Sequence, residues 1–173
     1  MRRLTVFIVL AAALLATVAS AAEPPREIPM VRVHAQTAVT APPTAVWSAL
    51  TQGKTLVTWC PVWKNPANAK VAITKVGDVL DFTDEWGHGG RSVVTYLARD
   101  RELRIAHEPN DGSYVCQAKL VLTPKGNTTT VDYWEQYSDE SAPKDRSATM
   151  SKMESELTRT LAEMKSAVEK HPR

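Results

Sequence analysis

The chain has 173 residues, of which 21 are basic and 19 are acidic, and its formal charge is +2. Both surplus basic residues, Arg2 and Arg3, lie within the first 21 residues, so the remaining chain is formally neutral. It therefore lacks the basic surplus that nucleic-acid binding requires. The remaining length of about 150 residues suits one domain with a core of its own.

Residues 1–21 have the pattern of a cleaved secretory signal peptide. Arg2 and Arg3 are followed by an apolar run over residues 4–18 and by the small residues Ala19-Ser20-Ala21. This order is typical of a secretory signal, and the apolar run is short for the about 20 residues that span a bilayer. We therefore expect an exported protein, periplasmic in a bacterium or extracellular, with no stable membrane anchor after cleavage.

The next residues, 22–30, contain prolines and predict a flexible lead-in to a single domain over residues 31–170. Apolar side chains alternate over residues 31–39, which predicts a strand with one buried face. The strand should end at Pro42, because proline cannot continue a strand ladder.

Two short helices are expected after this strand. Pro43 suits the first turn of a helix, and Val46, Trp47 and Leu50 share one helical face. Gly53 is a candidate C-terminal cap of this helix. A second helix is expected over residues 54–59.

A series of strands separated by turn signals follows. Trp86-Gly87-His88-Gly89-Gly90 and Pro109-Asn110-Asp111-Gly112 are typical of turns. The turns recur about every 10 residues, which indicates an antiparallel meander. Strands are expected over residues 70–74, 78–83, 91–98, 102–108, 113–122 and 128–137.

The chain closes with the pattern of one long amphipathic helix of about 23 residues, or about 35 Å. Its apolar positions are three or four residues apart: Met150, Met153, Leu157, Leu161, Met164 and Val168. A helix of this length can lie across a whole small sheet. The order of elements predicts an α+β fold with helices on one face of an antiparallel sheet.

Several local motifs accompany this order of elements: Ala41-Pro42-x-x-x-Val46-Trp47-x-x-Leu50-Thr51, Trp59, Val76-Gly77-Asp78, Trp86-Gly87 and Leu122-x-Pro124-x-Gly126-x-x-Thr129. With them and the long last helix, the chain resembles the START-like, or helix-grip, superfamily (SRPBCC), especially its polyketide cyclase-like branch. The resemblance covers about residues 31–170. It implies a helix-grip fold, with a curved antiparallel sheet of about six to seven strands around the C-terminal helix and a cavity between them.

Candidate ligand-binding residues follow from where aromatic, small and flexible side chains fall. Tryptophans at element ends often rim a pocket, small strand residues leave space, and methionines adapt to irregular ligands. Packing of loops and core by the same side chains is the alternative. The candidates are Trp59, Trp63, Trp86, Tyr114, Cys116, Ala118, Tyr133, Met153, Leu157 and Met164.

The last strand carries the best polar candidates, Tyr133 and Glu135, if this face points inward. Trp134 is equally apolar and would reverse the strand, so both orientations stay open. An inward Glu135 needs a partner, because burial of an isolated carboxylate is costly. We consider Arg91, Tyr114 and a ligand hydroxyl as that partner.

Recognisable catalytic and metal-binding motifs are absent from the sequence. There is no Gly-x-Ser-x-Gly nucleophile motif, and the four histidines have no metal-ligand spacing. We therefore expect neither a metal nor a cofactor. Cys60 and Cys116 could form a disulfide that closes a 57-residue loop, worth about 4 kcal/mol if unstrained, and buried free thiols are the alternative.

Three functions remain open. The first is a non-enzymatic carrier or sensor of a small hydrophobic molecule, such as a lipid, an aromatic or a polyketide-like compound. The second is a cyclase or aromatase with Glu135, Tyr133 and His107 as acid–base groups. The third is a structural or protein-binding module with a fully packed interior.

Overall fold

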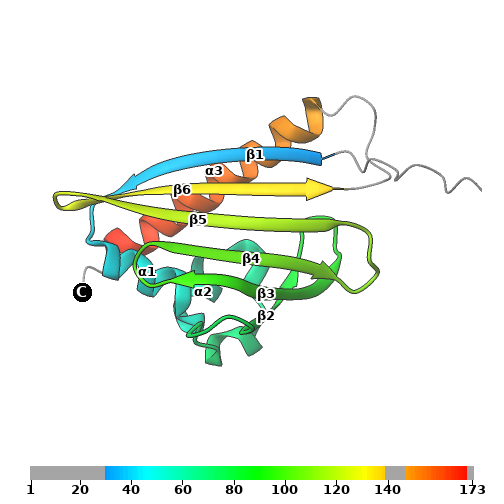
Figure 1. Ribbon diagram of the computed structural model, residues 1–173, viewed down its shortest axis with the longest axis horizontal. Coiled ribbons are helices and arrows are strands. Elements are labelled where there is room, and N and C mark those ends of the chain that lie inside the picture. The colour runs from blue at the N-terminus through cyan, green and yellow to red at the C-terminus, as the bar shows by residue number, and fades with distance from the viewer. Residues whose placement is uncertain (1–29, 139–146, 171–173) are drawn as a thin grey trace, which may run out of the picture.

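The computed structural model describes residues 30–138 and 147–170. In these residues six antiparallel strands form one sheet in the order β1-β6-β5-β4-β3-β2, and the helices lie on one face of it (Figure 1). The strands are β1 (Met30–Val39), β2 (Val79–Thr83), β3 (Gly89–Ala98), β4 (Glu102–Pro109), β5 (Val115–Lys125) and β6 (Thr128–Ser138). The helices are α1 (Pro43–Thr51), α2 (Gly53–Trp59) and α3 (Ser147–Lys170), with short 3-10 helices η1 (Pro61–Trp63) and η2 (Pro66–Lys70).

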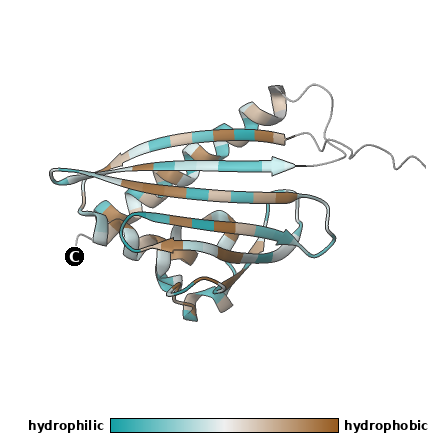
Figure 2. Ribbon diagram, in the orientation of Figure 1, coloured by the Kyte–Doolittle hydropathy of each residue, from teal (hydrophilic) through white to brown (hydrophobic). Residues whose placement is uncertain are grey.

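The predicted α+β helix-grip fold is confirmed. Burial alternates along β1, β4 and β5, and the alternation of hydropathy can be followed along β4 in Figure 2. Helix α3 packs along β1 and against α1 and α2. Its predicted apolar face is buried from Met153 to Val168, and Met150 is partly buried. The fold thus follows from two local periodicities, two residues for the strands and 3.6 for the helix.

The register of the sheet decides which residues meet beneath α3. The last strand β6 is internal, because it pairs with both β1 and β5. His107 of β4 lies opposite Cys116 of β5, and Ala118 of β5 lies opposite Glu135 of β6. A histidine, a cysteine and a glutamate, His107, Cys116 and Glu135, therefore come from the three adjacent strands β4, β5 and β6.

The strand predicted over residues 70–74 is wrong. Its first residue ends η2, and Ala72 forms only an isolated bridge with Gln52. The N–H of Gly53 donates to the carbonyl of Val71 over 2.8 Å, and the N–H of Ile73 donates to the carbonyl of Thr51 over 2.8 Å. The segment satisfies its backbone at the α1–α2 junction, so it does not join the sheet.

Gly53 begins α2 and does not cap the end of α1 as expected. A Cβ atom placed on it would lie 1.8 Å from the Asn68 carbonyl oxygen and 2.5 Å from that of Val71. Glycine is required here by close backbone approach, since its φ is not in the left-handed region.

The predicted signal peptide, residues 1–21, lies outside the described residues, as does the lead-in up to residue 29. Within residues 30–138 and 147–170, no helix combines the length and the apolar composition needed to cross a membrane.

Candidate ligand-binding cavity

A cavity of about 190 Å³ lies between the helix-covered face of the sheet, α3 and the turn that follows β2. Its walls are mainly apolar and aromatic, with a few polar groups. Helix α3 contributes Met153 and Leu157, and the segment after α2 contributes Cys60. The strands contribute Phe82, His107, Cys116, Tyr133 and Glu135, and Tyr114, the residue just before β5, contributes as well.

Six of the ten predicted ligand-binding residues line this cavity: Trp86, Tyr114, Cys116, Tyr133, Met153 and Leu157. The two other acid–base candidates, His107 and Glu135, line it as well. The sequence therefore located both the sheet wall and the helix wall of the cavity. Their binding and catalytic roles stay predictions.

The other four candidates lie elsewhere. The indole N–H of Trp59 donates to the carbonyl of Ala49 over 3.2 Å, which packs α2 on α1. Ala118 and Met164 are buried in the core beyond the cavity. Each lies on the correct face of its element, but the cavity occupies only one end of that face.

Trp63, the fourth of these residues, lies behind the cavity wall. Its indole N–H donates to Ser92 Oγ over 2.8 Å, and this oxygen lies 2.9 Å from Nδ1 of His107. All three side chains are buried. Trp63 therefore supports the His107 ring without facing the cavity.

The structure settles which face of β6 points inward. Tyr133 and Glu135 face the cavity, and Trp134 lies on the opposite face, stacked on His34 with ring centroids 3.8 Å apart. The hydroxyl of Tyr133 donates to Glu135 Oε1 over 2.5 Å. Burial raises the pKa of the Glu135 carboxyl, and the Tyr133 hydrogen bond opposes this rise.

The prediction that Arg91 or Tyr114 is the partner of Glu135 is wrong, because both side chains have other partners. Arg91 forms an exposed ion pair with Glu108, at 3.0 Å. The hydroxyl of Tyr114 donates to Asp84 Oδ2 over 2.9 Å. The partner is instead Tyr133, which lies on the same strand and the same face, two residues away.

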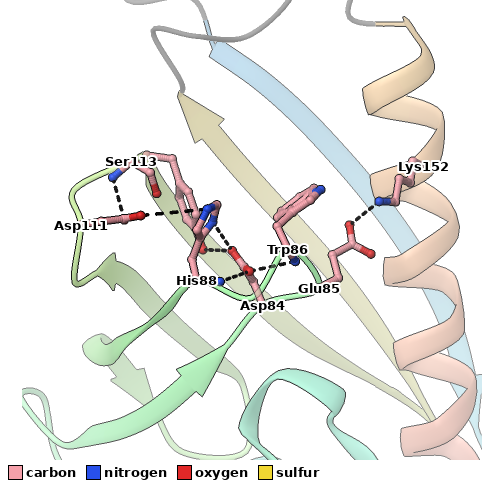
Figure 3. A network of polar contacts seen from close by, with 8 residues as sticks. Asp84, Glu85, Trp86, His88, Asp111, Ser113 and Lys152 are labelled. Atoms are coloured by element: carbon pink, nitrogen blue, oxygen red, sulfur yellow. Dashed lines mark hydrogen bonds and ion pairs between the residues drawn. The ribbon is translucent and has the colours of Figure 1, made fainter.

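Asp84 organises the turn between β2 and β3 at the edge of the cavity (Figure 3). Its Oδ1 accepts from the N–H groups of Trp86, over 3.0 Å, and His88, over 2.8 Å. Its Oδ2 accepts from Tyr114 and lies 3.1 Å from Nδ1 of His88. The glycine-rich segment is thus a hairpin turn, as predicted, with Gly87 at a φ of +88°.

One side-chain pair joins this turn to α3. Lys152 Nζ lies 3.4 Å from Glu85 Oε1 and 5.2 Å from the centre of the half-exposed Trp86 ring (Figure 3). Exposed pairs of this kind contribute about 0–1 kcal/mol. This pair therefore adds little to the attachment of the turn to the helix.

The sequence of this domain matches a known protein family. Residues 40–169 match the family described as Activator of Hsp90 ATPase homolog 1-like protein (AHSA1). The chain belongs to the AHSA1-like family. A sequence search of curated proteins finds no match.

Solved structures share the fold of this AHSA1-like chain at low sequence identity. MLL2253 from Mesorhizobium loti is 14% identical with a TM-score of 0.63, covering 83% of this chain and 100% of its own. Aha1 from Colwellia psychrerythraea, solved as a dimer in solution, is 21% identical with a TM-score of 0.58, covering 80% and 96%.

DynU16, a protein in the dynemicin biosynthetic locus, is 17% identical with a TM-score of 0.61 over 80% of this chain. The AHSA1-like chain spans 47% of DynU16, just under half of its length. Together the matches confirm the resemblance to the START-like, or helix-grip, superfamily (SRPBCC). At these identities the solved structures show the fold alone.

The two cysteines of the AHSA1-like domain are free thiols, so the candidate disulfide does not form in the structure. Both are buried and both line the cavity. Burial raises the pKa of Cys60 to about 12 and that of Cys116 well above its usual value. Two protonated thiols therefore belong to the apolar wall.

Three polar side chains of this domain form a group that no pattern in the sequence indicates. The donor atoms of His107, Cys116 and Glu135 all lie within 4.8 Å of one another. Burial lowers the pKa of His107 to about 4, so its imidazole is neutral at neutral pH. The three residues are 9 and 19 positions apart in the chain, which matches no linear ligand motif, and only the register of β4, β5 and β6 brings them together.

Proposed function

We propose that this protein is an exported carrier or sensor that holds one small, mainly apolar molecule in its cavity. The observation that carries the proposal is the combination of apolar walls with the Glu135 carboxyl in one cavity. Binding sites for small molecules combine a mostly apolar lining with a few placed polar groups. The preferred molecule therefore carries one hydrogen-bond donor, such as a hydroxyl, for Glu135.

The volume narrows the class of molecule. An apolar cavity of about 150 Å³ is known to bind benzene, so a cavity of about 190 Å³ suits a single substituted ring. Most drug-sized ligands need about 300–1,000 Å³. The volume favours a small aromatic molecule over a lipid or the long folded chain of a polyketide.

The same volume counts against the cyclase or aromatase alternative, although Glu135, Tyr133 and His107 all line the cavity. A polyketide cyclase must enclose a long folded chain around its acid–base groups. A purely structural module would not need an apolar cavity with a carboxyl in its wall. The carrier function accounts for both features.

Export is the second part of the proposal, and it rests on the signal-like residues 1–21. The family name refers to an activator of the Hsp90 ATPase, a role that we do not transfer to an exported protein. Intact mass of the protein recovered outside the cytoplasm should place its N-terminus within two residues of Ala22. A full-length mass in the membrane fraction would contradict export.

Binding of p-cresol and p-xylene tests the proposed ligand class, because the two differ by one hydroxyl in place of a methyl group. We expect p-cresol to bind about 10–100-fold more tightly, since a hydrogen bond to a charged group contributes about 1.5–3 kcal/mol. Isothermal titration calorimetry measures both affinities. Glu135→Leu should remove the preference for p-cresol.

Glu156→Leu is the matched control, because Glu156 also lines the cavity but is paired with Arg159. This variant should keep the preference for p-cresol. Equal affinities for the two compounds in the wild-type protein, or a preference that survives in Glu135→Leu, would refute the proposed role of Glu135. If neither p-cresol nor p-xylene binds, the carrier function is refuted.

A further inference from the structure

We propose that His107, Cys116 and Glu135 form a zinc-binding site in the wall of the cavity. This site does not depend on the hydrophobic ligand proposed above. It departs from the expectation of no metal, which rested on linear spacing alone.

The sheet brings the three proposed ligands close together. His107 lies opposite Cys116 on the neighbouring strand. Glu135 lies on the next strand, opposite Ala118, which is two residues from Cys116 and on the same face. Their donor atoms lie within 4.8 Å of one another. Bonds of about 2.0–2.3 Å place the donors of a tetrahedral zinc site roughly 3.3–3.8 Å apart. Side-chain adjustments of about 1 Å therefore suffice, because strands hold the backbone positions.

The combination of nitrogen, sulfur and oxygen donors favours zinc over magnesium and calcium. Zinc accepts imidazole nitrogen, thiolate sulfur and carboxylate oxygen, whereas magnesium and calcium require oxygen ligands. Three protein ligands leave a fourth tetrahedral position, as in open zinc sites. Because all three side chains line the cavity, that position faces the space in which a small molecule or water is held.

The charges also match. On binding, the Cys116 thiol releases its proton to solvent, and its thiolate together with the Glu135 carboxylate cancels the charge of Zn²⁺. His107 adds a neutral ligand. A neutral metal site is far less costly in an apolar cavity than an uncompensated ion.

Two of the three ligands are already supported by neighbours. Ser92 Oγ accepts from the indole N–H of Trp63, over 2.8 Å, and lies 2.9 Å from Nδ1 of His107. In the tautomer of His107 that donates from Nδ1 to this oxygen, Nε2 keeps its lone pair for a metal. Zinc-binding histidines are usually held by their second ring nitrogen in this way. Tyr133 holds Glu135 by a hydrogen bond of 2.5 Å.

Titration with Co²⁺, a spectroscopic substitute for zinc, tests the site in the full domain. The wild-type protein should show a near-ultraviolet thiolate-to-Co²⁺ charge-transfer band that saturates at one metal per chain and is removed by added Zn²⁺. Cys116→Ser should lose the band. Cys60→Ser is the matched control, because it removes the other buried thiol of the same cavity and should keep the band.

Zinc-edge X-ray absorption is measured on the wild-type protein, so this test does not depend on whether a variant folds. It should show one sulfur and otherwise nitrogen or oxygen ligands. Ser92→Ala, which removes the support of His107, should weaken zinc binding by about 10–100-fold, and Cys116→Ser should weaken it more. A band that persists in Cys116→Ser, equal loss in the two cysteine variants, zinc with no sulfur ligand, or weak binding unaffected by all these substitutions would each overturn the site.

Discussion

Met153→Trp should abolish binding of p-cresol and leave the melting temperature of the domain nearly unchanged. Met153 lines the cavity from α3 and is almost fully buried. An indole at this position would occupy space that a ligand otherwise fills, so the added bulk displaces no core atoms. Paired thermal melts and calorimetric titrations measure the two effects on the same protein.

Met164→Trp is the matched control on the same helix face. Met164 is 0% exposed and belongs to the core, outside the cavity. The larger side chain has no free space there and should overpack the core, with a typical cost of about 1–3 kcal/mol. Protein that stays folded should still bind p-cresol.

Comparison of the two methionine variants separates a ligand cavity from a packed core. Lost binding without a lower melting temperature in Met153→Trp supports the carrier function. An equal drop in melting temperature in both variants would mean that the space beside Met153 is filled by core atoms. Unchanged p-cresol binding in Met153→Trp would place the ligand elsewhere.

Gly53→Ala should destabilise the domain by about 3 kcal/mol or more, at the upper end of the cost of overpacking. The added Cβ would lie 1.8 Å from the Asn68 carbonyl oxygen, and backbone atoms would have to move to relieve this contact. Asn68 resists movement, because its side chain bonds the carbonyls of Trp63 and Asp81 and accepts from the N–H of Asp81. Urea denaturation measures the loss as a lower midpoint.

Gly89→Ala serves as the control for this substitution. The nearest atoms to a Cβ on Gly89 lie 3.8 and 3.9 Å away, and its φ is not in the left-handed region. Its cost should stay within about 1 kcal/mol. Similar urea midpoints for the two alanine variants would show that the α1–α2 junction is looser than its backbone contacts indicate.

Local periodicity was sufficient to predict most of the fold. Alternation over residues 31–39 and 113–122 identified β1 and β5, and spacing of three or four identified the buried face of α3. These signals are reliable because each describes one element against one apolar layer. Residues 70–74 were misassigned, since an apolar run also suits a segment that bonds to a helix junction.

The cavity could be predicted only in part. Periodicity shows which side chains face the interior, so Tyr114, Cys116 and Met153 were correctly placed on inward faces. It does not show where along those faces the sheet and the helix separate. Ala118 and Met164 share the faces of true lining residues but lie where the two layers are in contact.

What the sequence by itself determined, therefore, is the set of elements and the side of each that is buried. The tertiary structure alone decided which buried residues meet: the inward face of β6, the Tyr133–Glu135 hydrogen bond, and the cluster of His107, Cys116 and Glu135. The reason is physical. Burial is encoded by neighbours a few residues apart, whereas the pairing of strands and the gap beneath a helix depend on contacts between residues far apart in the chain.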